Sequence, residues 1–154
     1  MLATLAFVVG SCNSDDDSNG SVILPPSSSV PDYLKEGTDA RPYWVAPDDR
    51  LFESMMSLQV QLGDTLVNYQ SANDLICATI DDEVRAVTGP QTTAGEVYYP
   101  LSIYSDGRAV TIALRYYCDR LHRIYTITNW ATFDPSCAPL GDDGIYRPKF
   151  TLGK

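Results

Sequence analysis

The sequence predicts an all-β protein, an antiparallel β-sandwich of the immunoglobulin-like or jelly-roll-like kind, preceded by a disordered N-terminal segment. Beyond Arg41, short runs of Val, Ile, Leu, Tyr and Thr alternate with turn residues, which is the pattern of many short strands. No apolar repeat with helical spacing continues for a dozen residues in this region. The length of 154 residues fits one such domain and a tail.

The chain opens with an apolar run that ends at a cysteine. Residues 2–9 have the length of a signal-peptide core and are too short to span a bilayer, which takes about 20 residues. The residues Val9-Gly10-Ser11-Cys12 resemble the lipobox of bacterial lipoproteins, in which the cysteine is acylated and becomes the new N-terminus. The alternative is a buried first strand, but the acidic residues 13–17 that follow could not pack against a core. We therefore predict a signal peptide over residues 1–11 and attachment of fatty chains such as palmitate to Cys12.

Residues 12–40 are predicted to form a flexible linker. Ser, Asp, Gly and Pro dominate them, and apolar residues are too sparse to offset the entropy cost of ordering. Residues 1–40 hold six acidic residues and one lysine, a net charge of −5, which leaves −4 for the remainder of the total of −9. A short strand or a helical turn within residues 30–37 is left open. The acidic residues 13–17 resemble the export signal that places lipoproteins of Bacteroidetes on the outer face of the outer membrane.

The predicted domain, residues 41–154, begins with strands of clear alternation. Residues 54–62 alternate between polar and apolar side chains, so one face should lie in the core. Residues 74–80 and 83–88 are strand-like runs on either side of Asp81-Asp82, which we interpret as a turn. The predicted core-facing residues of the first strand are Met56, Leu58, Val60 and Leu62.

Residues 96–118 are predicted to form a β-hairpin around Asp106-Gly107, a favoured dipeptide of two-residue type I′ turns. In the register that this turn sets, four cross-strand pairs are entirely apolar or aromatic and share a core face. Pro100 indicates that its strand has a free or bulged edge on the other side. A third strand over residues 123–128 would extend the core face. The predicted pairs are Ile103–Val110, Leu101–Ile112, Tyr99–Leu114 and Val97–Tyr116, followed by Tyr116–Tyr125 and Leu114–Ile127.

The outward face of this hairpin holds the candidate ligand-binding residues. The predicted register places Tyr98 beside Arg115, with Tyr104 and Tyr117 close by. Flat aromatic rings pack against the C–H faces of sugars, and neighbouring polar groups hydrogen-bond to the sugar hydroxyls. The alternative is that these tyrosines only stabilise the sheet, with Tyr98 and Arg115 as a cation–π pair.

The four cysteines predict lipidation and one disulfide rather than a metal site. They form no CxxC pair and the chain has one histidine, so neither a zinc site nor any other metal or cofactor is expected. Once Cys12 is acylated, three cysteines remain in an oxidising compartment. We favour a disulfide between Cys118 and Cys137, because Cys118 ends one strand and Cys137 follows its neighbour. Cys77 would then be a free thiol in the core.

Charge and motif content argue against several other functions. The net charge of −9 disfavours nucleic acid, which binds basic surfaces, and anionic membrane surfaces for the same reason. His122 lies in a predicted loop with no nucleophile motif around it. The acidic groups at residues 81–83 and 142–144 lie in turn contexts, where Asp and Gly are favoured for backbone reasons, and calcium binding is the alternative.

Scattered positions of the domain follow a recurring pattern, which has Trp44 near its start. The matching residues are Asp74, Ile76, Ala78, Arg85, Leu101, Ile103, Tyr104, Tyr116, Tyr117 and Tyr125. On these residues, the stretch 41–152 resembles a small β-sandwich module found in secreted and surface proteins of Bacteroidetes. Cys77 and Thr79 depart from the usual pattern, where Ala and Phe are found. The resemblance implies a fold and a location but no particular activity.

Together these observations predict a lipid-anchored protein on the surface of the outer membrane. Its β-sandwich is expected to be a non-catalytic binding or structural accessory module, associated with the membrane through its anchor and with a glycan or a surface protein complex. The runner-up is a glycan-binding lipoprotein of a polysaccharide-uptake system that uses the outward tyrosines. A hydrolase is a distant third.

Overall fold

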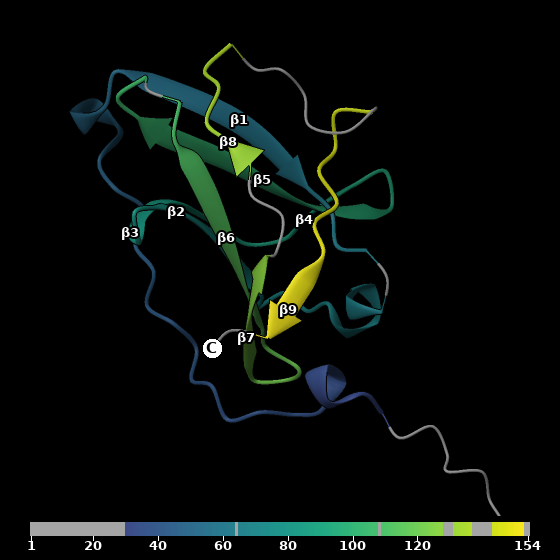
Figure 1. The fold of residues 1–154 in the computed structure, drawn as a ribbon. Coiled ribbons are helices and arrows are strands. Elements are labelled where there is room, and N and C mark those ends of the chain that lie inside the picture. The colour runs from purple at the N-terminus through teal and green to yellow at the C-terminus, as the bar shows by residue number, and fades with distance from the viewer. Residues whose placement is uncertain (1–29, 64, 108, 128–130, 137–142, 153–154) are drawn as a thin grey trace, which may run out of the picture. The chain divides into compact units, whose positions relative to one another are not determined.

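The computed structural model describes residues 30–63, 65–107, 109–127, 131–136 and 143–152. The chain divides into two units, residues 1–32 and 33–154, and the strands belong to the second (Figure 1). The predicted signal peptide, the lipidation residue Cys12 and most of the predicted linker lie outside the described residues.

Short strands and single turns of 3₁₀ helix make up the described fold. The helical turns are η1 (Asp32–Leu34), η2 (Asp49–Leu51) and η3 (Leu66–Tyr69). The strands are β1 (Ser54–Val60), β2 (Leu75–Ile80), β3 (Glu83–Thr88), β4 (Gln91–Thr93), β5 (Glu96–Ser105), β6 (Thr111–Cys118), β7 (Arg123–Ile127), β8 (Ala131–Thr132) and β9 (Phe150–Leu152).

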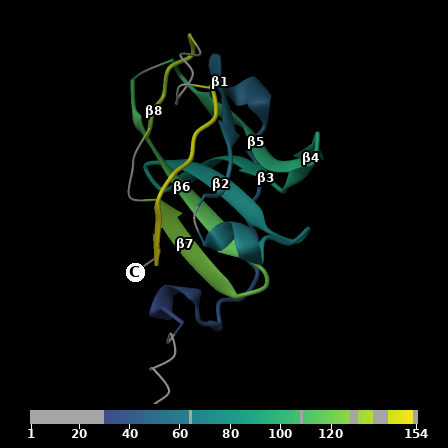
Figure 2. The same cartoon turned by 90° about the vertical axis from the view of Figure 1, so that its right-hand side faces the viewer.

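Two antiparallel sheets confirm the predicted all-β sandwich. One sheet has the order β1-β5-β4, and the other has the order β3-β2-β6-β7-β9 with β8 paired to β6. Figures 1 and 2 show β1 and β5 side by side, with β2, β6 and β7 in the other layer. Buried side chains from both sheets form one hydrophobic cluster between the layers, which is the core of the domain.

Several local predictions are confirmed. In β1 the expected alternation holds, since the four residues of residues 54–62 that were predicted to face the core are buried. Asp81 and Asp82 form the two-residue turn between β2 and β3, with φ of +51° and +66°, as a type I′ turn requires. The register of β6 and β7 is also as expected, with Tyr116 opposite Tyr125.

The predicted hairpin of residues 96–118 is wrong. β5 pairs with β1 and β4, whereas β6 pairs with β2, β7 and β8, so the two strands belong to opposite sheets. The residues that were expected to pair side by side, such as Leu101 and Ile112, instead join the same core from opposite layers. Alternation specifies which side of a strand is buried, but the same pattern arises whether two strands share a sheet or face each other across the core.

The pairing of β5 with β4 stops before Pro100, which agrees with the predicted free or bulged edge at this residue. The backbone N–H and C=O of Gln59, its partner on β1, point away from β5, because the Gln59 carbonyl accepts from the Tyr146 N–H at 2.8 Å. The nitrogen of Pro100 therefore faces the other edge of β5, where the pairing with β4 stops at Tyr98.

Residues 33–39, which the sequence assigned to the linker, are hydrogen-bonded to the β6–β7 end of the domain. The Gly37 N–H donates to the Leu121 carbonyl at 2.7 Å, and the Asp39 N–H donates to the His122 carbonyl at 2.9 Å. The Asp39 carboxylate accepts from the Ile124 N–H at 2.7 Å. The helical turn η1, which the sequence left open as a possibility, lies at the start of this segment.

Candidate functional site

The structure separates the four residues that were predicted to share one outward face. Tyr98 and Tyr104 lie on β5 in one sheet, whereas Arg115 and Tyr117 lie on β6 in the other. The predicted shared face and the predicted pair of Tyr98 with Arg115 are therefore wrong. The reason is that β5 and β6 were predicted to pair with each other, whereas they lie in opposite sheets.

Arg115 and Tyr117 are engaged elsewhere. The Arg115 guanidinium donates to the Asp82 carboxylate in the β2–β3 turn at 2.7 Å. Tyr117 is only 2% exposed, and its burial, together with the nearby Asp119 carboxylate, raises the pKa of its hydroxyl. Tyr117 therefore has almost no surface to offer a ligand, and the candidate site reduces to the β5 tyrosines.

Tyr104 lies in an open cleft at the outer side of the β1–β5 sheet. It stands opposite Met55 in the register, and Met55 is 43% exposed. The cleft has a volume of about 270 Å³ and combines aromatic and aliphatic surface with carboxylates and a guanidinium. Its lining residues are Asp49, Arg50, Phe52, Glu53, Ser54, Met55 and Tyr104.

Side chains from outside β5 hold Tyr104 in place. The Phe52 ring packs nearly parallel to the Tyr104 ring, with centroids 6.5 Å apart and planes inclined by 25°. The Arg85 guanidinium lies over the Phe52 ring, 4.6 Å from its centroid, and donates to Glu83 at 2.9 Å. Arg85 is the extra residue of a bulge between β2 and β3, so its side chain leaves the regular alternation of the strand. A tyrosine packed in this way has little freedom to lose when a ligand binds.

The charged side chains at the rim of the cleft differ in whether they form an ion pair. The Asp48 carboxylate caps η2 by accepting from the Arg50 N–H at 3.1 Å, and it pairs with the Arg50 guanidinium at 2.8 Å. This contact lowers the pKa of Asp48 and raises the pKa of Arg50. The Glu53 carboxylate is exposed and has no ion-pair partner among the described residues. Glu53 is therefore available to accept hydrogen bonds from a ligand.

Between Tyr98 and Tyr104, the two outward tyrosines of β5, the outer face of the sheet is polar and uncharged. Ser57 lies opposite Ser102, and Gln59 lies opposite Pro100. Ser57, Gln59 and Ser102 are exposed, and Pro100 is half-buried. This part of the face offers hydroxyl and amide groups rather than charges.

Tyr98 belongs to a polar network at the other end of this face. Its hydroxyl donates to the Glu96 carboxylate, which also accepts from Gln61 at 3.4 Å. Arg147 donates to Gln61 at 3.1 Å and pairs with Asp143 at 2.9 Å. The hydrogen bond between Tyr98 and Glu96 lowers the pKa of Glu96 and raises the pKa of Tyr98. These contacts orient the side chain of Tyr98 on the outer face.

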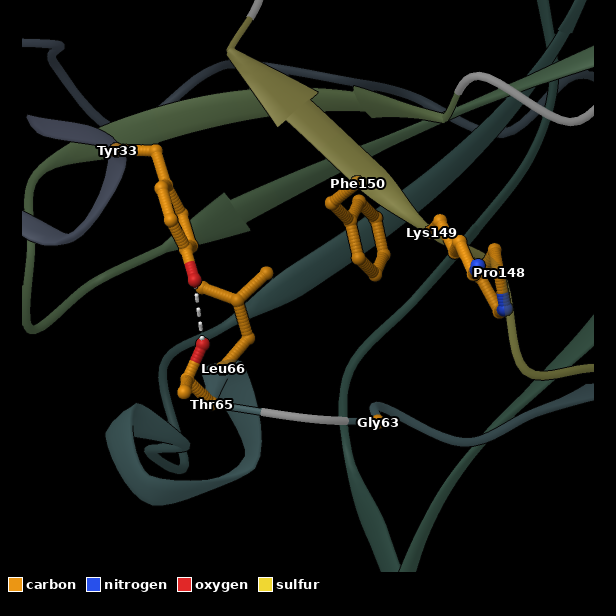
Figure 3. Close-up of a pocket in the computed structure, with 7 residues that line it drawn as sticks. All are labelled: Tyr33, Gly63, Thr65, Leu66, Pro148, Lys149 and Phe150. Atoms are coloured by element: carbon orange, nitrogen blue, oxygen red, sulfur yellow. Dashed lines mark hydrogen bonds between the residues drawn. The ribbon is translucent and has the colours of Figure 1, made fainter. Parts of the chain in front are cut away.

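A second cavity, of about 190 Å³, lies where three segments of the second unit meet (Figure 3). Tyr33 reaches it from η1, Thr65 and Leu66 from the start of η3, and Phe150 from β9. The hydroxyls of Tyr33 and Thr65 are hydrogen-bonded to each other at 3.0 Å. Each hydroxyl is thus already engaged in one hydrogen bond, and we take the cleft, with its aromatic ring and exposed carboxylates, as the better candidate for a ligand site.

The cysteines are buried where the structure describes them. Cys77 is a free thiol, and burial raises its pKa to about 12. Cys118 is also free, and its Sγ donates to the Tyr69 carbonyl at 3.6 Å. A free Cys118 thiol disagrees with the predicted disulfide between Cys118 and Cys137, and Cys137 itself lies outside the described residues.

The histidine that was considered as a catalytic residue lies in a turn. His122 lies in the β6–β7 turn with a φ of +47°, and its Nε2 is 4.0 Å from the Glu36 carboxylate.

Among the described residues, no three or more His, Cys, Asp or Glu side chains cluster to hold a metal. In that same part of the chain, no helix is long and apolar enough to cross a bilayer.

Of the residues that line the cleft, only Tyr104 was predicted from the sequence as a candidate site residue. Met55 could have been found, because it is an apolar residue on the otherwise polar face of an alternating strand. Phe52 and Glu53 precede the strand and carry no periodic signal. Comparison of the chain with protein-family models, curated proteins and solved structures finds no match.

Proposed function

We propose that this protein is a surface-exposed lipoprotein of the outer membrane whose β-sandwich is a non-catalytic binding module. Its binding surface is the cleft at Tyr104 together with the adjoining outer face of the β1–β5 sheet. One observation carries the proposal: the Tyr104 ring is packed on Phe52 beside the exposed Met55 and the exposed Glu53. An aromatic surface with a few polar groups at its rim suits recognition of a ligand.

The location rests on the sequence before the described domain. The small residues before Cys12 and the acidic block after it support acylation and export to the outer face. Several acyl chains on Cys12 would hold the protein firmly, since each buried methylene contributes about 0.8 kcal/mol. The four acidic residues of residues 12–32, without a lysine or arginine among them, would keep the tether extended and the domain away from the lipid.

The chemistry of the cleft supports binding rather than catalysis. Catalytic acids and bases are commonly partly buried, because burial and neighbouring charges tune their pKa values. The carboxylates of Asp49 and Glu53 are exposed to solvent. His122 lies in a turn at the β6–β7 end of the domain and does not line the cleft.

The location is tested by replacing the lipidated residue. In a bacterium with a lipoprotein-processing pathway, the intact protein is expected in the outer-membrane fraction and accessible to protease added to whole cells. Cys12→Ser should move the protein to the soluble fraction, whereas Cys77→Ser should leave it in the membrane. Membrane retention of Cys12→Ser would contradict the anchor.

The binding surface is tested by cross-linking on whole cells. A photo-reactive residue in place of Met55 should capture a surface component, and Tyr104→Ala in the same chain should abolish the adduct. The matched control places the photo-reactive residue at Tyr43, which is 93% exposed and does not line the cleft. Equal adducts at both positions would contradict a specific surface at the cleft.

A further inference from the structure

We infer that the outer face of the β1–β5 sheet binds a neutral glycan chain that runs along β5 from Tyr104 to Tyr98. The inference rests on the proposed function and adds the chemical class of the ligand. It follows from the spacing of the two tyrosines, the groups between them and the charges at either end.

The two tyrosines mark out an elongated site. They are six residues apart on one strand, so they project from the same face about 20 Å apart at the usual rise of about 3.3 Å per residue. That distance exceeds one sugar ring and suits a chain of several rings. A small ligand would contact one tyrosine only, whereas a chain laid along β5 would contact both.

Contacts within the protein hold both tyrosines in place. Tyr104 packs on Phe52, and the Tyr98 hydroxyl donates to Glu96. Ordered aromatic side chains provide a large contact area at a low cost in conformational entropy. Each ring could therefore receive the C–H face of one sugar at either end of the chain.

The groups between the tyrosines match sugar hydroxyls. Ser57, Ser102 and Gln59 are exposed there and carry both donors and acceptors. A protein partner would favour a patch with an apolar core that becomes fully buried. The centre of this face is polar, and its larger apolar side chains lie at the ends.

The charge of the surface selects a neutral chain over an acidic one. At the Tyr104 end lie Asp49 and Glu53, together with Arg50, which pairs with Asp48. At the Tyr98 end lie Glu96 and Asp143, together with Arg147, which pairs with Asp143, so the carboxylates outnumber the guanidinium groups at both ends. Residues 41–154 carry a net charge of −4. Uronic acid or sulfated chains would be repelled by this field, whereas neutral sugars would accept hydrogen bonds without that cost.

The experiment titrates the full-length Cys12→Ser protein with purified oligosaccharides. The panel contains neutral β-glucan, xylan and mannan hexasaccharides, their disaccharides, and acidic galacturonan and heparin hexasaccharides. We expect saturable binding of at least one neutral hexasaccharide and weaker binding of its disaccharide. The backbone amide NMR signals of Ser57 and Ser102 should shift during the titration. Tyr98→Ala and Tyr104→Ala should each weaken binding about tenfold, the ratio that 1.4 kcal/mol produces.

Matched variants separate lost contacts from lost folding. Tyr98→Phe and Tyr104→Phe keep the rings and should weaken binding less than the alanine variants do, with a larger loss for Tyr98→Phe because it also removes the hydrogen bond to Glu96. Tyr43→Ala should bind as the parent does. Failure of every neutral chain to bind, or equal affinities of the alanine variants and Tyr43→Ala, would overturn the inference. Binding of only an acidic chain or a basic peptide at Met55 and Ser102 would also overturn it, while leaving the proposed binding module intact. Failure of the proposed function would appear separately, in the cell fractionation and cross-linking.

Discussion

The hydroxyl of Tyr116 donates a 2.7 Å hydrogen bond to the carboxylate of Asp74, which is fully buried between the two sheets. The same carboxylate accepts from the Tyr99 hydroxyl at 3.3 Å, so Asp74 joins β6 of one sheet to β5 of the other. It also accepts from the N–H and hydroxyl of Ser71 and from the Asp119 N–H. Five donors thus surround one buried carboxylate, so its oxygens are hydrogen-bonded in the interior although no ion-pair partner of Asp74 lies among the described residues.

Removing this carboxylate should destabilise the whole domain. Asp74→Ala would leave two tyrosine hydroxyls and two backbone N–H groups in the interior without their acceptor, and we expect a loss of roughly 3–5 kcal/mol. Asp74→Asn keeps one oxygen and should lose less. Denaturant unfolding measures both, with the exposed Asp106→Ala as the control that should unfold as the parent does. An Asp74→Ala midpoint equal to that of the control would show that the network contributes little.

Gly37 should be required for residues 33–39 to lie against the domain. A Cβ at this position would come within 2.6 Å of the Arg123 Cγ and 2.8 Å of the His122 carbonyl oxygen. Gly37→Ala must therefore displace the segment, with an expected cost of about 1–3 kcal/mol, as overpacking usually has. Hydrogen exchange at the Asp39 N–H should accelerate.

Gly63 provides the matched control for this substitution. A Cβ at Gly63 would meet no atom within 4 Å, so Gly63→Ala should leave both stability and exchange nearly unchanged. Unchanged exchange at Asp39 in Gly37→Ala would mean that the neighbouring chain yields without losing its hydrogen bonds.

The faces of the strands were predictable from the sequence, but their partners were not. Alternation identified the buried side of β1, and the stretch from Tyr116 to Tyr125 is short enough for its turn to set the register. The two-residue turn at Asp81-Asp82 is likewise local. β5 and β6 also follow each other closely, yet they enter different sheets, where β5 pairs with β1 and β6 pairs with β2. These partners lie far away in the chain, so local sequence does not identify them.

The cleft and the hydrogen bonds of Asp74 were likewise only partly predictable from the sequence. Tyr104 was named as a candidate because it alternates outward, which is a local property. Its contact with Phe52, and the contact of Phe52 with Arg85, join three segments that no periodic pattern relates. The Asp74 carboxylate similarly collects donors from positions up to 45 residues away.

Alkaline pH should weaken the fold through buried groups that hold their protons more tightly than the unfolded chain does. Burial raises the pKa of Cys77 from 9.0 to about 12 and the pKa of Tyr125 from 10.0 to about 12. The stability that these groups contribute is complete below the lower unfolded value, and it falls as pH rises toward 12 because the unfolded state releases its protons first. Unfolding midpoints measured between about pH 8 and pH 11 should decline steadily.

Cys77→Ala isolates the contribution of the thiol to this pH dependence. The variant should show a smaller decline than the parent between about pH 9 and pH 10, where the unfolded thiol but not the unfolded tyrosine ionises. Identical slopes for the two proteins would rule out the thiol as a cause. The native thiol should also react slowly with a thiol reagent at neutral pH and rapidly after unfolding, because it is buried and protonated.

Substitutions of Arg85 test whether its charge or its packing supports the Phe52 ring, on which Tyr104 packs. Its Nε and Nη1 atoms are buried and have no hydrogen-bond partner among the described residues, and such donors each cost about 1–3 kcal/mol. The cation–π contact with Phe52 gains only about 2 kcal/mol or less. Arg85→Met keeps a long side chain against Phe52 and removes the unpaired donors, so stability should stay the same or rise by about 1 kcal/mol. Arg85→Ala also removes the packing and should be destabilising, with a loosened Phe52 ring visible in aromatic NMR spectra. If Arg85→Met is as unstable as Arg85→Ala, the guanidinium charge itself stabilises the stack and its two nitrogens must find partners in solution.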